Sequence, residues 1–233
     1  MTPAHAGSAA SVPKQFLAIA GVPVLVHCLR AFLAVARVEA IYVAVRKPEI
    51  ERVEAQIAEF GLGAKVHVVE GGDQRQQSVG NALAQLVSET GCAEDDVVLV
   101  HDAARPLIDP ATIDRTIDAV AEQGAAIVGL PAVDTIKQVE RTAHGAIVTA
   151  TIPRERIVQA QTPQGARCGL LRRAFAEAAA DEFLGTDEAS LLERAGIAVA
   201  VVAGSAKNFK ITQPGDLELA GFYLQKTTTD KNG

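Results

Sequence analysis

Aromatic residues are scarce in this sequence, and tryptophan is absent. Phe, Trp and Tyr together make up 4% of the chain, although 48% of its residues are hydrophobic. Valine, alanine, leucine and isoleucine must therefore fill the core. This composition suits a sheet covered by helices better than a sandwich of aromatic-rich strands.

The sequence also lacks the cysteine and histidine spacings of structural sites. Cys28, Cys92 and Cys168 are odd in number and far apart, so no C-x-x-C pair occurs, and the five histidines form no H-x-x-x-H pair. These absences argue against a disulfide framework and against a zinc site.

A surplus of basic charge is missing as well. The chain has 22 Lys and Arg against 28 Asp and Glu, a formal net charge of −6. This balance excludes a general nucleic-acid binder, but it allows a local cationic pocket for one phosphorylated small molecule. No apolar run approaches 18 residues and no signal peptide is recognisable, so we expect a cytoplasmic protein without a membrane segment.

From about residue 24 the pattern alternates between helices and strands. Helical spacing covers 24–37, 48–61, 78–89 and 110–124, and β-branched runs cover 39–45, 65–70, 97–100 and 125–131. Strict alternation predicts a Rossmann-like three-layer α/β fold with a mainly parallel sheet. Two more helices (about 167–180 and 186–196), strands at 198–204 and 208–212, and a closing helix from Pro214 complete the prediction.

The alternation breaks between residues 132 and 165. Two β-leaning segments flank Ala143-His144-Gly145, which predicts a β-hairpin arm at about 134–156 on a single domain, 1–233. A lone hairpin cannot bury both of its faces, so a partner subunit is the expected cover.

Polar clusters follow the predicted strands, at the sheet edge where α/β proteins bind ligands. They are Gly71 to Arg75, His101 to Arg105 and Asp134 to Lys137, and the predicted strand 208–212 itself carries Lys210. Singly, a Gly-Gly-Asp is most often a turn and an Asp-x-x-Arg a local ion pair. Together they would gather a carboxylate, arginine and lysine in one crevice. Near the start, small residues precede Lys14, which fits either a phosphate loop or a flexible end with one solvated lysine.

Seven motifs, in order, give a specific resemblance: Pro13-Lys14-Gln15-Phe16; Gly71-Gly72-Asp73-x-Arg75-x-x-Ser78-Val79; His101-Asp102-Ala103-Ala104-Arg105-Pro106; Asp134-Thr135-x-Lys137; Gln161-Thr162-Pro163-Gln164; Thr186-Asp187-Glu188-Ala189-Ser190; and Asn208-Phe209-Lys210-Ile211-Thr212. Over roughly residues 12 to 225 the chain closely resembles the 2-C-methyl-D-erythritol 4-phosphate cytidylyltransferase family. The resemblance implies a nucleotidyltransferase fold and transfer of CMP from CTP to a sugar-alcohol phosphate, with release of pyrophosphate, in the non-mevalonate isoprenoid pathway. It also implies Mg²⁺ and a homodimer joined by the arm.

The same resemblance implies the roles of individual residues. Lys14 and Lys210 would hold the CTP phosphates, Asp102 the metal, and Arg154, from the partner's arm, the sugar phosphate; these four are the predicted catalytic residues. Further nucleotide contacts would come from Ala4, Gly7, Ser8, Gly71, Gly72, Asp73, Ser78, Ala103 and Ala104. Substrate contacts would come from Arg105, Thr135, Arg154 and Thr186.

Several of these residues also have a purely structural reading. Arg154 could be a rim charge on an edge strand, and Thr186 could cap a helix. Gln161 to Gln164 read as a structural turn, and His101 reads as packed or bonded to the backbone.

The N-terminus departs from the family pattern. Only Met1-Thr2 precede Pro3, too little for the family's first strand, and no arginine occurs before Arg30 to match its phosphate-loop arginine. Either the given sequence omits residues or the protein is truncated and a poor catalyst; we favour the first. Two alternatives stay open: a ribitol 5-phosphate cytidylyltransferase, and a catalytically silent nucleotide-binding homologue.

Overall fold

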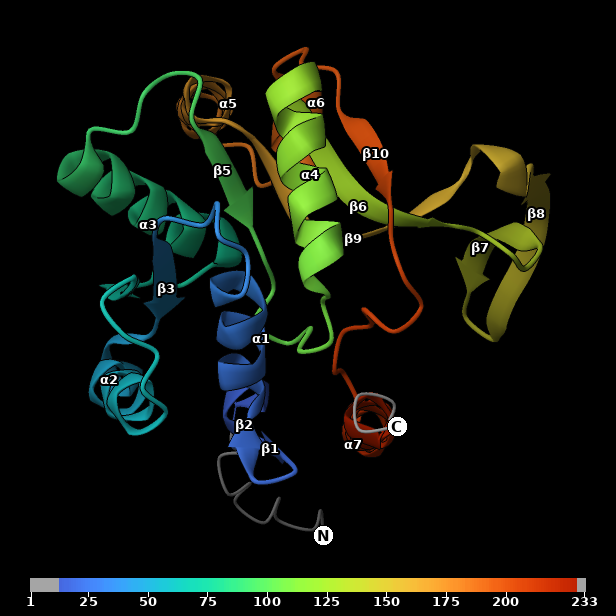
Figure 1. The fold of residues 1–233 in the computed structure, drawn as a ribbon. Helices are drawn as coiled ribbons and strands as arrows, with labels where there is room; N and C mark the ends of the chain where they lie inside the picture. The colour runs from blue at the N-terminus through green and yellow to red at the C-terminus, as the bar shows by residue number, and fades with distance from the viewer. Residues whose placement is uncertain (1–12, 230–233) are drawn as a thin grey trace, which may run out of the picture.

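The computed structural model describes residues 13–229 and has a mixed α/β architecture with a central sheet (Figure 1). Ala4, Gly7 and Ser8, predicted to contact the nucleotide, lie outside the described residues.

The first half of the fold is built around a parallel pair of strands. β3 and β4 pair from Ile41 with Val66 to Val45 with Glu70. Val53, fully buried, packs against this pair together with Leu25 and Leu29. The elements in chain order are η1 (Lys14–Phe16), β1 (Ala18–Ile19), β2 (Val22–Pro23), α1 (Val24–Leu33), β3 (Ile41–Val45), η2 (Lys47–Glu49), α2 (Ile50–Glu59), β4 (Val66–Glu70) and α3 (Arg75–Thr90).

The second half contains a four-stranded sheet in the order β10-β6-β9-β5. Its helices cover it with apolar side chains such as Ile113, Val120, Leu171 and Leu192, all fully buried. The elements are β5 (Val97–Val100), α4 (Pro110–Gln123), β6 (Ala125–Pro131), β9 (Val158–Arg167), α5 (Cys168–Ala180), α6 (Glu188–Arg194), β10 (Ala200–Ala203) and α7 (Pro214–Thr229). Between residues 13 and 229, no helix is both long and apolar enough to cross a membrane.

The direction of β9 differs from the predicted mainly parallel sheet. β10 is parallel to β6, whereas β9 is antiparallel to both β6 and β5. The chain between β6 and β9 contains only hairpin segments and no crossover helix, so it returns antiparallel. These segments are β7 (Ile136–Thr142), β8 (Gly145–Ile152) and η3 (Arg154–Arg156).

β7 and β8 pair antiparallel from Ile136 with Ile152 to Thr142 with Gly145. Figure 1 places this hairpin to one side of the sheet, away from the helices. We call residues 134–156 the arm.

Two local predictions were wrong. Residues 208–212 are not a strand: Ile211 N–H bonds to the carbonyl of Ala104 (2.8 Å), which ties the segment to the loop after β5 instead of to a strand edge. Gln161 to Gln164 are not a turn but the buried middle of β9. Both glutamines can lie in a buried strand because hydrogen bonds satisfy their amides; the Gln164 amide, for example, donates to Asp187 and accepts from Ala189 N–H.

Candidate active site

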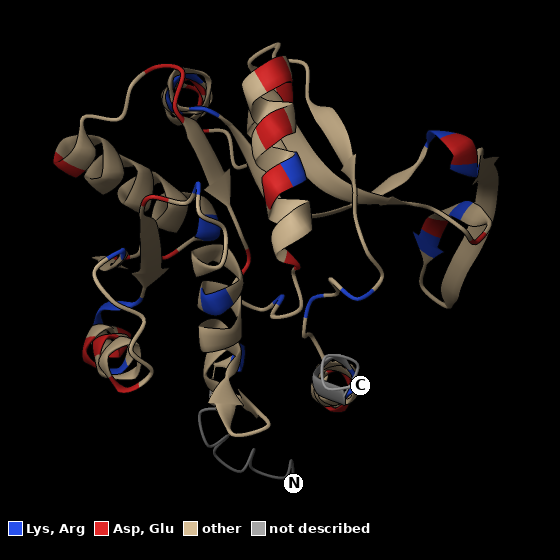
Figure 2. Cartoon of the chain, in the orientation of Figure 1, with Lys and Arg blue, Asp and Glu red and all other residues tan. Residues whose placement is uncertain are grey.

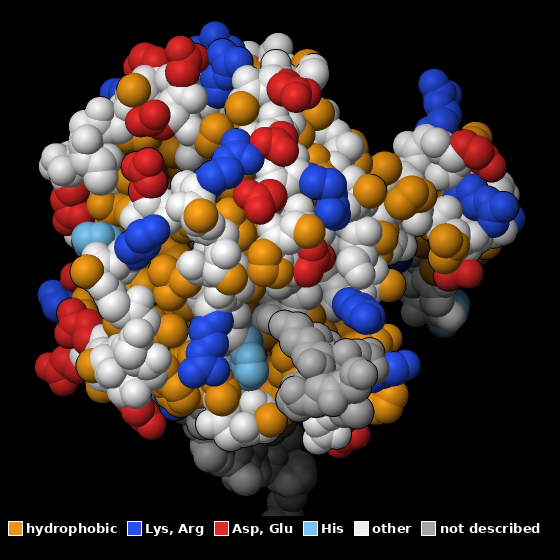
Figure 3. All heavy atoms as spheres, viewed as in Figure 1, with side chains coloured by type: hydrophobic (Ala, Val, Ile, Leu, Met, Phe, Trp, Pro, Cys, Tyr) orange, Lys and Arg blue, Asp and Glu red, His pale blue; other side chains and the backbone are white. Residues whose placement is uncertain are grey.

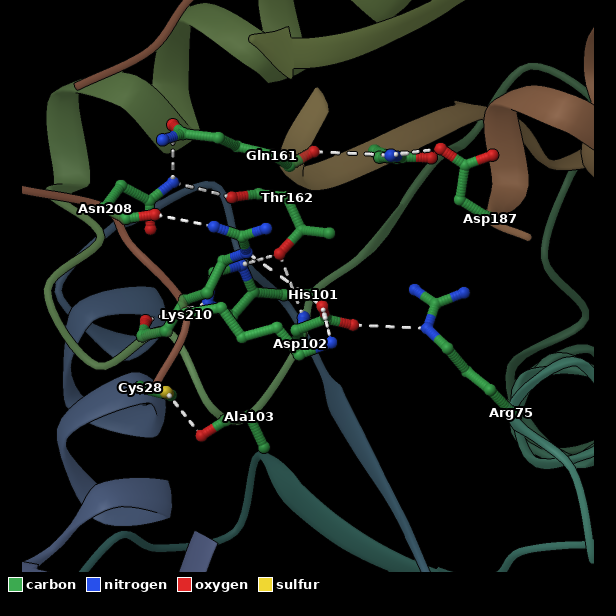
Figure 4. A network of polar contacts seen from close by, with 12 residues as sticks. Cys28, Arg75, His101, Asp102, Ala103, Gln161, Thr162, Asp187, Asn208 and Lys210 are labelled. Carbon is green, nitrogen blue, oxygen red and sulfur yellow. Dashed lines mark hydrogen bonds and ion pairs between the residues drawn. The ribbon is translucent and has the colours of Figure 1, made fainter. Parts of the chain in front are cut away.

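Asp102 follows β5 and lies at the centre of a cluster of cations (Figure 4). Its side chain is only 14% exposed. Lys210 Nζ donates to Oδ2 at 2.8 Å, Arg75 Nε donates to Oδ1 at 3.2 Å, and Arg105 Nε lies 3.9 Å from Oδ2. The structure thus brings together three segments that the sequence had placed at one crevice: the start of α3, the loop after β5, and the chain before α7.

The charges around Asp102 keep its carboxylate ionised. Burial acts to raise the pKa of Asp102, but the hydrogen bond from Lys210 and the charge of Arg75 outweigh it, so the net pKa is lowered. Burial lowers the pKa of Arg105, against the charge of Asp102.

A buried carboxylate holds the far side of Arg75. Glu188, 1% exposed, accepts from Nη1 at 2.7 Å and from Nη2 at 2.8 Å. Burial acts to lower the pKa of Arg75, and the hydrogen bonds and charge of Glu188 reverse this into a net increase. One guanidinium therefore bridges two carboxylates with all three of its nitrogens.

His101 bonds to the backbone, as the sequence had indicated. Its Nε2 lies 3.1 Å from the carbonyl of Arg105 and its Nδ1 3.0 Å from Thr162 Oγ1. A carbonyl can only accept, so Nε2 carries the proton and Nδ1 accepts from the Thr162 hydroxyl. That hydroxyl accepts in turn from Asp102 N–H at 3.0 Å, so the relay fixes the Asp102 backbone. Burial lowers the pKa of His101 to about 4, which keeps the ring neutral.

Lys14 reaches the same region from the other end of the chain. Its Nζ donates to the carbonyl of Thr212 at 2.7 Å, two residues beyond Lys210. Asp216 accepts from the backbone of Thr212 and Gln213 and holds this segment at the start of α7. In Figure 2, basic residues lie on the chain before α7 and on the loop before α4.

The Gly71 to Gln74 turn leads directly into the N-terminus of α3. Gly71 N–H bonds to the carbonyl of Val45 (2.7 Å), and Gly72 N–H donates to Ser78 Oγ (3.1 Å). Gln77 Oε1 accepts from the N–H groups of Asp73 and Gln74. A hollow of about 450 Å³ opens beside the turn, lined among others by Gly72, Asp73, Arg75, Ser78, Gln15 and Arg46.

The alanines after Asp102 are held through their backbones. The carbonyl of Ala103 accepts from the Cys28 thiol (3.3 Å), and that of Ala104 accepts from Ile211 N–H. Arg105 Nη1 donates to the carbonyl of Asn208 at 2.8 Å. Burial raises the pKa of Cys28 to about 12, so this thiol is a packing group rather than a nucleophile.

The remaining residues predicted to contact the substrate, Thr135, Arg154 and Thr186, are exposed. Arg154, on the arm, donates to the carbonyl of Val133 at 2.6 Å, near Thr135. In the part of the chain that the structure describes, no hydrogen bond or ion pair joins either residue to Asp102. Thr186 does not cap α6: Asp187 accepts from Ser190 N–H and is the N-cap.

The sequence analysis gave no individual role to Glu188 or Arg75, although it placed Arg75 in a polar cluster at the sheet edge. The sequence carries a signal for each, because Arg75 is the first residue of a helix after Gly-Gly-Asp, and Glu188 directly follows a helix cap. Their contact joins residues 113 positions apart, which no local pattern reveals.

Among the described residues, no group of three or more His, Cys, Asp or Glu side chains could hold a metal ion.

Known proteins give a consistent comparison. The family model for 2-C-methyl-D-erythritol 4-phosphate cytidylyltransferase matches residues 4–226. The protein of that name from Acidobacterium capsulatum is 70% identical over 217 residues, 93% of this chain and 89% of the relative. The one from Solibacter usitatus is 48% identical over 213 residues, 91% of this chain and 85% of the relative.

Solved structures agree. A crystal structure of 4-diphosphocytidyl-2C-methyl-D-erythritol synthase has a TM-score of 0.78 and 34% sequence identity to this chain. The alignment covers 91% of this chain and 94% of that structure's chain. The 2-C-methyl-D-erythritol 4-phosphate cytidylyltransferase from Thermus thermophilus has a TM-score of 0.72 at the same identity and coverage. On these matches, which span nearly the whole sequence, the chain belongs to the 2-C-methyl-D-erythritol 4-phosphate cytidylyltransferase family.

Proposed function

We propose that the chain transfers CMP from CTP to 2-C-methyl-D-erythritol 4-phosphate and releases pyrophosphate, as one catalytic domain with an arm. The observation that carries the proposal is the Asp102 cluster, where Lys210, Arg75 and Arg105 surround one carboxylate. A cluster of three cations around one carboxylate suits two phosphorylated reactants that must approach each other.

The chemistry needs charge neutralisation more than proton transfer. A phosphate monoester is largely ionised at pH 7, since its second pKa is about 6, so its oxygen can attack the α-phosphorus without a general base. His101 fits this scheme, because both of its ring nitrogens are bonded within the fold. Lys14 and Lys210 would stabilise the charge that develops on the phosphates.

The residues present fit a Mg²⁺ ion that arrives with the nucleotide. Mg²⁺ is typically bound by one or two carboxylates together with substrate phosphates and water. Asp102 would be its protein ligand once Lys210 turns from Oδ2 toward the phosphates. The ion would neutralise phosphate charge.

The hollow beside α3 would hold the cytidine. Gly72, Asp73 and Gln74 line it, and a carboxylate such as that of Asp73 can accept from the exocyclic amine of cytosine. Ala103 and Ala104 would leave room for the ribose.

The arm would join two subunits. Val139 and Val148 face each other across the hairpin and are 48% and 55% exposed, and Ile147 is 63% exposed. Figure 3 shows the arm standing out from the body with apolar side chains on its surface. A second copy would cover them and would receive Thr135 and Arg154 next to its own Asp102 cluster, with Thr186 also near the substrate. We expect this dimer in the cytoplasm.

The function is tested by pyrophosphate release with CTP, Mg²⁺ and either methylerythritol phosphate or ribitol phosphate. Purified protein of confirmed intact mass should release pyrophosphate with methylerythritol phosphate and not with ribitol phosphate. Release with ribitol phosphate alone would reassign the substrate. CTP binding without release from either would favour a silent homologue.

The dimer is tested by light scattering after size exclusion. The wild-type mass should be twice that of the 24.3-kDa chain. Val148→Lys adds a charge to the apolar face of the arm and should give monomers, whereas the matched Val201→Lys, exposed on β10, should not. A dimeric Val148→Lys protein would argue against the arm as the interface.

A further inference from the structure

Glu188 stands apart from the reacting groups but is connected to them. Its carboxylate is buried at the first position of α6, and both of its oxygens bond to Arg75. A helix N-terminus favours a negative charge, so the position of Glu188 in α6 suits an ionised carboxylate. Arg75 is itself the first residue of α3.

The third nitrogen of Arg75 points away from Glu188. Its Nε bonds to Asp102 Oδ1, and the other oxygen of Asp102 accepts from Lys210 (Figure 4). The chain of contacts therefore runs from the buried Glu188, through the planar guanidinium of Arg75, to the Asp102 carboxylate. Asp102 lies on a loop, whereas Glu188 and Arg75 begin helices.

A purely structural role explains this arrangement poorly. Buried ion pairs are weak contributors to stability, since the cost of desolvation offsets most of their attraction. Two of the three guanidinium nitrogens would also suffice to pair with Glu188, yet the third reaches the reaction site.

We infer that Glu188 is a positioning residue for Asp102, acting through Arg75. By holding the guanidinium on both of its outer nitrogens, Glu188 aims Nε at Oδ1 and sets the plane of the Asp102 carboxylate. Oδ2 is then the oxygen left to face Lys210 and the reactants. This inference rests on the proposed cytidylyl transfer for its kinetic part only.

Glu188→Gln keeps the shape of the side chain and removes its charge. We expect kcat for pyrophosphate release to fall on the order of 10- to 100-fold, because a small misplacement of an active-site group lowers the rate by about this much. KM for CTP should change less than about threefold, because the turn that lines the hollow is held by Ser78 and Gln77 and not by Glu188. The matched control is Glu177→Gln on α5, which removes an exposed partner of Arg173 and should leave kcat unchanged.

A double-mutant cycle with Asp102→Asn separates positioning from folding. If Glu188 acts through Asp102, then Glu188→Gln should cost less than about threefold in the Asp102→Asn background. An equal loss in both backgrounds would overturn the inference, and so would an unchanged kcat with a raised KM for CTP. Thermal unfolding of each variant shows what fraction is folded.

Arg75→Lys supplies a second variant, at a side chain that is 36% exposed. It keeps the positive charge but loses the planar guanidinium that bonds to two carboxylates at once, so kcat should fall as it does in Glu188→Gln. Wild-type kcat in Arg75→Lys would overturn the inference, because charge alone would then suffice.

A readout without turnover keeps failure of this inference distinct from failure of the proposed function. In ¹⁵N NMR, the Arg75 Nε–H signal, assigned by its loss in Arg75→Lys, should be protected from exchange in the wild type and exposed in Glu188→Gln. A signal equally protected in both proteins would show that Glu188 does not hold Nε on Asp102.

Discussion

At the residue scale, the site depends on a few charged groups whose surroundings differ sharply. Asp102 is nearly buried at 14% exposure, whereas its partner Lys210 is 45% exposed. A buried carboxylate keeps its direction, and an exposed lysine can turn toward an incoming phosphate. Because of this contrast, Lys210 is the first residue to substitute in a test of the site.

Lys210→Ala should lower kcat on the order of 10²–10³-fold, the usual cost of losing one preorganised charge donor. The measurement is pyrophosphate release at saturating CTP and methylerythritol phosphate. Lys65→Ala is the matched control, because Lys65 is exposed and its Nζ donates to the carbonyl of Val38. Similar rates for the two variants would remove Lys210 from the phosphate site.

His101 gives the stability of the protein a pH dependence of known sign. Its pKa is about 4 in the fold and 6.5 ordinarily, so between these values the unfolded chain binds more protons. Stability therefore falls as pH drops from about 6.5 toward 4. A protonated ring would also lose Nδ1 as the acceptor for Thr162.

The comparison that isolates this effect is His101→Gln, measured by thermal unfolding from pH 7 to pH 4.5. The wild type should lose more stability over this range than the variant, because the variant lacks the titrating ring. His144→Gln, on the exposed turn of the arm, should behave as the wild type does. Equal pH slopes for wild type and His101→Gln would contradict the buried neutral histidine.

At the element scale, the start of α3 shapes the hollow that we propose for the cytidine. A Cβ added at Gly72 would meet Gln77 Cβ at 2.5 Å and its Oε1 at 2.9 Å. Gln77 caps the helix by accepting from Asp73 and Gln74, so the turn cannot keep its shape if that side chain moves.

Gly72→Ala should therefore raise KM for CTP about tenfold or more, since a lost cap and a shifted turn together cost roughly 1–2 kcal/mol. Gly80→Ala is the matched control, because it lies in the same helix and its Cβ would meet Phe175 only at ordinary contact distance, 3.7 Å. Gly80→Ala should leave KM unchanged and add up to about 1 kcal/mol of stability. An unchanged KM in Gly72→Ala would place the cytidine elsewhere.

At the scale of the whole molecule, the exposed arm and the separate Asp102 cluster raise the question of which subunit completes which site. If Arg154 on the arm of one subunit completes the active site of the other, then Arg154→Ala and Lys210→Ala damage different halves of a shared site. A heterodimer of the two variants then retains one undamaged site.

Mixing the two inactive variants and allowing subunits to exchange should restore about a quarter of wild-type activity, since half of the dimers are mixed and each has one intact site. The control is each variant exchanged with itself, which should stay inactive. Activity that stays at the level of the single variants after confirmed exchange would place Arg154 in the site of its own subunit.

The sequence by itself determined most of the elements and the polar ends of the strands. β5 and β6 begin and end at the predicted residues, 97–100 and 125–131, because hydrophobic periodicity and β-branched runs are local properties. Asp102 and Arg105 were placed at the site by the rule that ligands bind at the carboxyl ends of strands, and Lys210 was expected beside them within a strand that the structure does not form. The structure places Arg105 and Lys210 each within 4 Å of Asp102.

The tertiary structure alone decided the direction of β9, the buried middle of that strand, and the Glu188–Arg75–Asp102 connection. β9 runs antiparallel to β6 because the segment between them, which includes the arm, contains no crossover helix. Gln161 and Gln164 are buried in β9 because groups distant in sequence satisfy their side-chain amides. Glu188 gained its contact with Arg75 only when α6 and α3 came together. Local patterns specify which element a residue joins, whereas long-range packing specifies its partners.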